Sequence, residues 1–144
     1  SEFRMAYTVL GDSVNLGSRL EGLTKNYGVD LICSEYTVSH ASQFSYRELD
    51  RVRVKGKNEP VTIYEPLCLS SDLGQNLKNE IELHVEGLNF YRSERWKDAE
   101  ECFSELQRIS DSSYIYKMYF DRIQHFKINP PASEWGGVFD HKTK

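Results

Sequence analysis

The sequence predicts an α+β fold, with a sheet portion followed by a small all-α portion. Residues 44–54 and 61–67 alternate between apolar and polar as strands do, and a polar, glycine-containing turn separates them. Beyond residue 76 the apolar period changes to about 3.6 residues, which is typical of helices. The chain has 144 residues, 39% of them hydrophobic, so it is long enough for one modest domain or two small ones.

The first predicted unit is a strand, a sharp turn and a helix over residues 7–26. Gly11 permits the turn, and Asp12 can cap the helix that follows. Asn15 and Arg19 are four residues apart, so they lie on one helix face. Arg donates a forked pair of hydrogen bonds to phosphate oxygens, and this suits a phosphorylated ligand near a helix N-terminus. The alternative is an amphipathic helix with two solvated polar residues, and spacing alone favours that alternative.

The middle of the chain predicts a short helix between strands. Gly28 marks the end of the first helix, and residues 29–33 form a short, mostly apolar strand. Ser34 is placed to begin a short helix over residues 35–41. Pro60 stands at the start of the second hairpin strand, where its missing N–H costs no ladder bond.

The C-terminal half predicts a helical hairpin and a third helix over residues 112–126. Small Gly87 and Ala99 would let the two hairpin helices approach closely. The extended tail contains three apolar residues that we expect to dock on the helical part, Trp135, Val138 and Phe139. The two apolar stripes of the hairpin are Leu77, Ile81, Val85, Leu88 and Tyr91, and then Trp96, Ala99, Phe103, Leu106 and Ile109.

Composition excludes several classes of function. The net charge of −4 argues against nucleic acid as a main partner, because no basic stripe is available to neutralise phosphates. No apolar run approaches the roughly 18 residues of a membrane span. The three cysteines show neither zinc nor disulfide spacing, which predicts reduced thiols and a cytoplasmic location, in a parent protein that could itself be membrane-anchored.

Two stretches carry a family resemblance. Residues 54–57 read Val-Lys-Gly-Lys and are followed by Glu-Pro-Val and Ile-Tyr-Glu, and residues 7–21 read Tyr-Thr-Val-Leu-Gly-Asp-Ser-Val-Asn-Leu-Gly-Ser-Arg-Leu-Glu. The second stretch closely resembles the segment of class III nucleotide cyclases whose usual form is Tyr-Thr-Val-Ile-Gly-Asp-x-Val-Asn-x-Ala-x-Arg-Leu. The Val-Lys-Gly-Lys stretch, with the residues that follow it, is similar to the last hairpin of the catalytic domain of these cyclases. The resemblance implies a ferredoxin-like fold with a mixed or antiparallel sheet, of which residues 4–67 would be the C-terminal third to half.

The resemblance also implies roles for four residues. Arg19 matches the position that stabilises charge at phosphorus, and Asn15 the position that orients the ribose. Lys55 matches a phosphate contact, although a solvated hairpin tip is the alternative. Thr8 matches a position that reads the purine, where Thr goes with adenine, so ATP is the expected substrate and a guanylate cyclase the alternative. An ordinary strand threonine is the other interpretation of Thr8.

The family uses Mg²⁺ or Mn²⁺ held by two aspartates, and both would lie upstream of this chain. We therefore expect no bound metal and no cyclase activity in this polypeptide alone, with the parent acting as an adenylate cyclase. The family's site forms between two catalytic domains, and a truncated sheet would expose strand edges, so a homodimer is expected.

The predicted organisation is a cyclase portion over residues 4–67, a linker over 68–76 and a helical extension over 77–144. The extension resembles one tetratricopeptide repeat, because its spacing of key residues matches that motif. The alternative is a non-catalytic helical module for dimerisation or protein interaction, attached to a cyclase-like remnant. The matching residues are Leu83, Gly87, Phe90, Trp96, Ala99 and Phe103.

Overall fold

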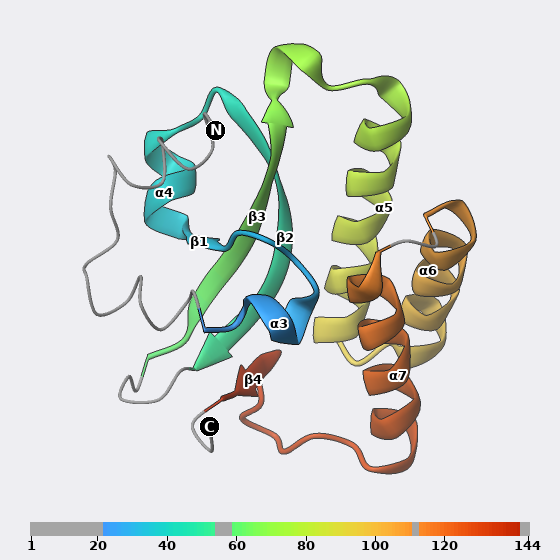
Figure 1. The fold of residues 1–144 in the computed structure, drawn as a ribbon. Helices are drawn as coiled ribbons and strands as arrows, with labels where there is room; N and C mark the ends of the chain where they lie inside the picture. Colours follow the sequence, from blue (N-terminus) through green and yellow to red (C-terminus); the bar gives the residue numbers. More distant parts are fainter. Residues whose placement is uncertain (1–21, 54–58, 111–112, 142–144) are drawn as a thin grey trace. The chain divides into compact units, whose positions relative to one another are not determined.

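The computed structural model describes residues 22–53, 59–110 and 113–141. The fold is α+β, as predicted, and it contains two compact units (Figure 1). One unit holds the described residues up to Leu73 together with Val138–His141, and the other is Gly74–Gly137. The chain thus leaves the sheet unit, forms the helical unit and returns to the sheet.

The sheet is mixed, with four strands among the described residues in the order β1-β3-β2-β4. Three of them are antiparallel neighbours: β1 (Cys33–Ser34), β3 (Val61–Leu69) and β2 (Phe44–Arg53). The fourth, β4 (Val138–Asp140), pairs in parallel with the end of β2 (Figure 1). The predicted hairpin is therefore confirmed, and a distant segment pairs beside it.

Two short helices accompany this sheet, α3 (Thr24–Tyr27) and α4 (Glu35–His40). Gly28 ends α3 in the left-handed region, with φ of 65°, and its amide bonds the carbonyl of Thr24. Glycine is suited to this position because it has no Cβ to clash. The buried apolar side chains of the unit form one core: Leu23, Tyr27, Ile32, Cys33, Ala41, Phe44, Leu49, Val52 and Ile63.

The helical unit contains α5 (Gln75–Arg92), α6 (Trp96–Ile109) and α7 (Tyr114–Ile128). Gly87 brings α5 against α6, because a Cβ there would lie 3.0 Å from Phe103 Cε2 and 3.1 Å from Cys102 Cβ. Ala99 is fully buried as well. The predicted hairpin with small residues at its crossing is confirmed.

The buried face of α5 differs from the predicted stripe. Val85 is 43% exposed, whereas His84 and Gly87 are buried. Leu88 and Tyr91 of the predicted stripe are buried, and the two added core positions were not predicted because histidine and glycine have low hydrophobicity. Ile109, the last member of the second stripe, is likewise 46% exposed at the end of α6.

The tail divides between the two units. Trp135 packs in the helical unit, with ring centroids 5.1 Å from Tyr91, 5.9 Å from Trp96 and 5.2 Å from Phe126, so its predicted docking is confirmed. The same prediction is wrong for Val138 and Phe139, because both pair with β2 as part of β4.

The predicted linker over residues 68–76 is partly ordered structure. β3 continues to Leu69, and a 3₁₀ turn spans Ser70–Asp72. The backbone amide of Ser70 bonds the carbonyl of Gln43, and the hydroxyls of Ser45 and Ser70 lie 2.9 Å apart. These bonds extend the hairpin beyond the point where its apolar alternation ends. That the sheet unit is a cyclase portion and the helical unit a tetratricopeptide-like extension stays a prediction.

An ion pair between α6 and α7 makes the helical unit sensitive to acid. Lys127 Nζ donates to Glu100 Oε1 over 2.6 Å, and this hydrogen bond lowers the pKa of Glu100 below its usual 4.5. The pair therefore stabilises the fold at pH values above the pKa of Glu100 in the unfolded chain. This stabilisation is lost as the pH falls through the lower pKa of Glu100 in the folded protein.

Replacing Lys127 by methionine is expected to lower the free energy of unfolding at about pH 7 by no more than about 1 kcal/mol, because the pair is partly solvated. The difference from the unaltered chain should be smaller at an acid pH below the lowered pKa of Glu100 in the folded protein, because the carboxylate is then protonated and no longer pairs with Lys127. Urea unfolding at the two pH values measures it. K78M, at an exposed lysine of α5, is the control, and an equal loss in both variants would contradict the prediction.

Candidate functional site

All four residues predicted for nucleotide binding lie outside the described residues. Thr8, Asn15 and Arg19 fall in residues 1–21, and Lys55 falls in residues 54–58. Their grouping into one site therefore stays a prediction. The structure does describe the elements that flank them in the sequence, α3 after the first three residues and the end of β2 before the fourth.

A buried carboxylate lies at the junction of these flanking elements. Asp50 on β2 is fully buried, and its Oδ2 accepts a hydrogen bond of 2.6 Å from the hydroxyl of Tyr27 on α3. Its Oδ1 accepts from the backbone amide of Arg51 over 2.8 Å. Aspartate is almost never fully buried unless it is paired, so these bonds explain its place in the core. The Tyr27–Asp50 contact joins α3 to β2.

His141 extends this contact to the C-terminal segment. Its Nε2 lies 2.9 Å from the Tyr27 hydroxyl oxygen. Because Tyr27 gives its one proton to Asp50, the oxygen must accept, so Nε2 of His141 carries a proton and donates. The order of donation is therefore from His141 to Tyr27 to Asp50. We call these three residues the His-Tyr-Asp chain.

The sequence analysis missed the His-Tyr-Asp chain. An aspartate between Leu49 and Val52 is a sequence signal of a carboxylate held in a core. The strand is also irregular here, with a register shift between Glu48 and Asp50 on β2. No local pattern indicated His141, which lies 114 residues from Tyr27.

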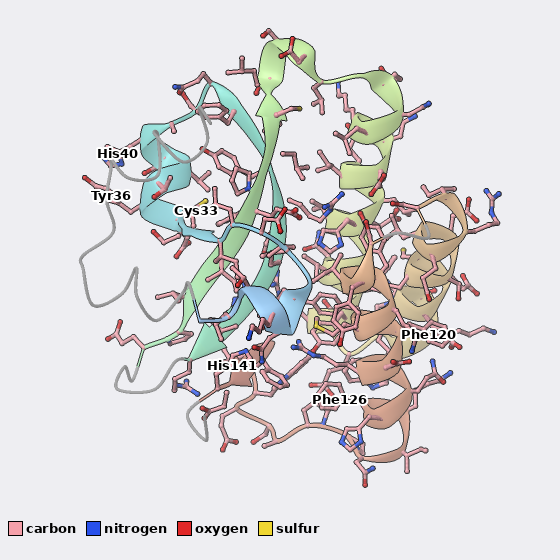
Figure 2. All side chains as sticks on the ribbon, viewed as in Figure 1. Cys33, Tyr36, His40, Phe120, Phe126 and His141 are labelled. Atoms are coloured by element: carbon pink, nitrogen blue, oxygen red, sulfur yellow. The ribbon has the colours of Figure 1, made fainter. Side chains whose placement is uncertain are left out.

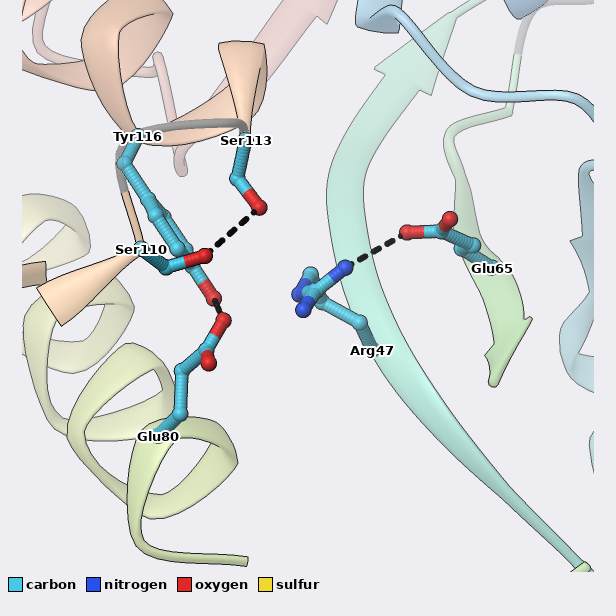
Figure 3. A network of polar contacts seen from close by, with 6 residues as sticks. All are labelled: Arg47, Glu65, Glu80, Ser110, Ser113 and Tyr116. Carbon is cyan, nitrogen blue, oxygen red and sulfur yellow. Dashed lines mark hydrogen bonds and ion pairs between the residues drawn. The ribbon is translucent and has the colours of Figure 1, made fainter. Parts of the chain in front are cut away.

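Other polar contacts of the sheet unit are structural. Arg47 on β2 donates to Glu65 on β3 over 2.8 Å, and the two residues are cross-strand partners (Figure 3). The hydroxyl of Tyr46 donates to the carbonyl of Ala41, and burial raises the pKa of Tyr46 to about 12, with a smaller contribution from Cys33. On α4 the rings of Tyr36 and His40 stack 4.0 Å apart (Figure 2).

The helical unit has its own polar and aromatic cluster. Tyr116 on α7 donates to Glu80 on α5 over 2.6 Å, as Figure 3 shows. His84 is fully buried, and its ring lies 5.5 Å from Tyr116 and 5.8 Å from Phe103. Burial raises the pKa of the Cys102 thiol to about 11. A thiol that stays protonated and a histidine surrounded by rings favour a packing role over a chemical one.

Neither a metal centre nor a membrane span is found in the part of the chain that the structure describes. No group of three or more His, Cys, Asp or Glu side chains there could hold a metal ion. Among the same residues, no helix combines the length and apolar character needed to cross a bilayer. Cys33, Cys68 and Cys102 are not joined by disulfides.

The Tyr27–Asp50 contact gives a stability prediction. Replacing Tyr27 by phenylalanine keeps the ring but removes the donor, which leaves a buried carboxylate oxygen without this bond. The free energy of unfolding should fall by about 2 kcal/mol, the usual size for a hydrogen bond to a charged group. Urea unfolding followed by circular dichroism measures the loss. Y36F, at a half-exposed tyrosine, should be close to neutral, and equal effects of the two changes would contradict the prediction.

Comparison with known proteins gives three partial similarities. The chain is 48% identical over 66 residues to "Adenylate cyclase" of Anabaena cylindrica, covering 43% of this chain and 13% of that protein. It is 38% identical over 63 residues to "Adenylate cyclase 1" of Rhizobium meliloti (strain 1021), covering 43% of this chain and 10% of that one. No protein-family model and no solved structure matches the chain.

The third similarity is longer. The chain is 32% identical over 133 residues to "Adenylate cyclase, terminal-differentiation specific" of Dictyostelium discoideum, and the match covers 88% of this chain. A match of that length includes most of the helical unit as well as the sheet unit. The chain covers only 6% of the Dictyostelium protein, so it spans between 6% and 13% of these relatives. The chain is therefore similar, over a small part of their length, to three proteins named adenylate cyclase.

Proposed function

We propose that this chain is the C-terminal part of a class III adenylate cyclase catalytic domain, followed by a helical extension of the same parent protein. The parent would convert ATP to cyclic AMP and pyrophosphate. The observation that carries this proposal is the similarity to three proteins named adenylate cyclase. The cyclase-like wording of residues 7–21 and 54–57 agrees with it.

The proposed roles follow from the chemistry of the side chains. The guanidinium of Arg19 would stabilise the negative charge that develops on the α-phosphate, which is electrostatic stabilisation of a transition state. Asn15 would hold the ribose by hydrogen bonds, and Lys55 would neutralise phosphate oxygens. Thr8 would accept a hydrogen bond from the adenine amino group, which favours ATP over GTP.

The metal-dependent part of the chemistry would come from outside this chain. Bound Mg²⁺ or Mn²⁺ would activate the 3′-hydroxyl and neutralise phosphate charge, held by aspartates of the upstream half of the domain. This chain would bind and orient the nucleotide. It would thus supply one half of a composite site, completed by a second subunit in a homodimer, and it would be inactive alone.

The test is a product assay on the full-length parent and on this chain. With Mg²⁺ or Mn²⁺, the purified parent should form cyclic AMP from ATP faster than cyclic GMP from GTP, whereas the isolated chain should form neither. Chromatography of the nucleotides measures both rates. Faster use of GTP would make the parent a guanylate cyclase, and activity of the isolated chain would overturn the half-site proposal.

A second candidate is a non-catalytic interaction or dimerisation module attached to a cyclase-like remnant. The separate core of Gly74–Gly137 favours it, because such a unit can serve as a binding surface of its own. The upstream sequence of the parent separates the two proposals. Two aspartates in the metal-binding positions would support the enzyme, and their loss would support the module. A cytoplasmic location fits either proposal.

A further inference from the structure

The His-Tyr-Asp chain lies wholly within the sheet unit, and it joins the two elements that flank the proposed nucleotide ligands in the sequence. Arg19 comes shortly before Tyr27, and Lys55 comes shortly after Asp50. We propose that Tyr27 and Asp50 are positioning residues of the proposed nucleotide site, because the bond between them sets the two flanking elements against each other. This inference rests on the proposed function and deepens it.

The bond between Tyr27 and Asp50 is buried and directional. Tyr27 is 1% exposed and Asp50 is 0% exposed, so bulk water is kept from both partners. The distance of 2.6 Å between the phenol oxygen and Oδ2 is typical of a hydrogen bond to a carboxylate. Such bonds are about twice as strong as those between neutral groups, and they weaken steeply when their geometry is disturbed. The contact therefore favours one placement of α3 on β2.

Both side chains are held close to their own backbones. The other oxygen of Asp50, Oδ1, accepts a hydrogen bond of 2.8 Å from the backbone amide of Arg51. Tyr27 is the last residue of α3, where the amide of Gly28 bonds the carbonyl of Thr24 and closes the helix. The bond thus couples two fixed stretches of backbone, and not two long side chains that could follow each other.

His141 (labelled in Figure 2) fixes the direction of the tyrosine hydroxyl. Its Nε2 donates to the phenol oxygen of Tyr27 over 2.9 Å, so the proton of that hydroxyl is directed to Asp50. The backbone amide of His141 donates to the carbonyl of Arg53 on β2 over 2.8 Å. The imidazole is therefore anchored on the same strand as the carboxylate, and it supports the Tyr27–Asp50 bond from within the sheet unit.

A buried carboxylate is an unfavourable way to hold two elements together if only stability is needed. Taking its charge out of water costs free energy that an apolar residue of similar size would not require. The core of the sheet unit already contains apolar side chains that are fully buried, among them Leu49, Val52 and Ile63. Apolar packing is non-directional, whereas a hydrogen bond favours a single arrangement. Placement is therefore what the carboxylate adds to this core.

The proposed chemistry depends on such placement. Arg19 and Lys55 would have to reach the same chain of phosphates, one from each of the two joined stretches. A shift of about 1 Å can lower a rate by on the order of 100-fold, even when the altered residue lies far from the chemistry. Loss of the bond should act mainly on kcat, because Arg19 is proposed to act in the transition state.

Phenylalanine at position 27 tests the inference in the full-length parent. Y27F removes only the hydroxyl, and it should lower kcat for cyclic AMP formation by about tenfold while KM for ATP changes by less than about threefold. Y46F is the matched control, because Tyr46 also donates within the sheet unit, to the carbonyl of Ala41 over 2.7 Å. It should keep kcat within about twofold. Urea unfolding of both variants checks that each is folded in the assay.

A double variant separates positioning from a general loss of stability. If Tyr27 acts through Arg19, its hydroxyl has little left to position once the guanidinium is gone. R19A/Y27F should therefore turn over within about twofold of R19A, because the effects of residues that act as a unit are not additive. A further loss of about tenfold in the double variant would mean that the two residues act separately, and it would overturn the inference.

Two substitutions at position 141 act on the same bond more mildly. Glutamine places an amide nitrogen near the position of Nε2, whereas the shorter asparagine places its nitrogen near Nδ1. H141N should lower kcat by about fivefold, and H141Q should stay within about twofold of the unaltered parent. This pair decides the inference if Y27F fails to fold.

The outcomes separate this inference from the proposed function. If the parent is active but Y27F and Y46F have equal kcat, or H141N and H141Q do, the positioning role is overturned and the proposed function stands. A parent that forms no cyclic nucleotide from ATP or GTP overturns the proposed function, and the positioning role with it. The inference predicts an active parent, a selective loss of kcat in Y27F and H141N, and no further loss when Y27F is added to R19A.

Discussion

Replacing Arg19 by alanine in the full-length parent is expected to lower the rate of cyclic AMP formation by on the order of 100-fold or more. In the proposed site the guanidinium faces the charge that develops at phosphorus, and removal of one such donor typically has an effect of this size. The loss should fall mainly on kcat, because the interaction is stronger in the transition state than in bound ATP.

The control variant for this prediction keeps a positive charge at position 19 but lacks the forked guanidinium donor. R19K keeps a positive charge but donates from a single nitrogen, so it should recover only part of the lost rate. A second pair compares the two lysines of the hairpin: K55A should raise KM for ATP, whereas K57A should leave it unchanged. Full activity of R19A, or equal effects of K55A and K57A, would contradict the proposed roles.

Replacing Phe103 by alanine is expected to lower the free energy of unfolding by about 4 kcal/mol, in the range for deleting a buried aromatic ring. The Phe103 side chain is fully buried, and its ring stacks on Tyr119 with centroids 5.1 Å apart. It also fills the space left by Gly87, where the two helices approach closely. The cavity left by alanine could not close without moving α5.

The matched control lies on the same helix. Ile109 is 46% exposed, so I109A should cost less than about 1 kcal/mol. Urea unfolding followed by circular dichroism compares both variants with the unaltered chain. A loss in F103A no larger than that in I109A would mean that Phe103 is not at the centre of this core.

The elements that local patterns predicted well are those whose partners lie nearby in the sequence. The β2–β3 hairpin was predicted because its two strands alternate and are joined by a short turn. The α5–α6 hairpin was predicted because Gly87 and Ala99 mark a close crossing. Local periodicity is informative when the neighbouring element supplies the other half of the core.

The features that the sequence did not predict depend on distant partners. β4 pairs with a strand that precedes it by 87 residues (Arg51 with Val138), and no local pattern indicates such a parallel contact. The buried face of α5 was misplaced because His84 is held among aromatic rings from α6 and α7. The hydrogen bond of buried Asp50 was not predicted, because its partner, Tyr27, lies on another element.

The proposed nucleotide site was identified from sequence motifs and not from the periodicity of apolar residues. Thr8, Asn15, Arg19 and Lys55 were identified by their place in two motifs, and all four lie outside the described residues. What the structure adds is the tie between their flanking elements. Tyr27 and Asp50 join α3, which follows the first motif, to β2, which leads into the second.

The central claim is that this chain supplies one half of a composite cyclase site, and complementation between two inactive parents tests it most directly. One parent carries R19A, and the other lacks one upstream metal-binding aspartate. Each alone should be close to inactive. Co-expressed in equal amounts, they should recover about a quarter of the unaltered rate, since half of the dimers would be mixed and each mixed dimer would hold one intact site of two. A mixture as inactive as its components would contradict the claim.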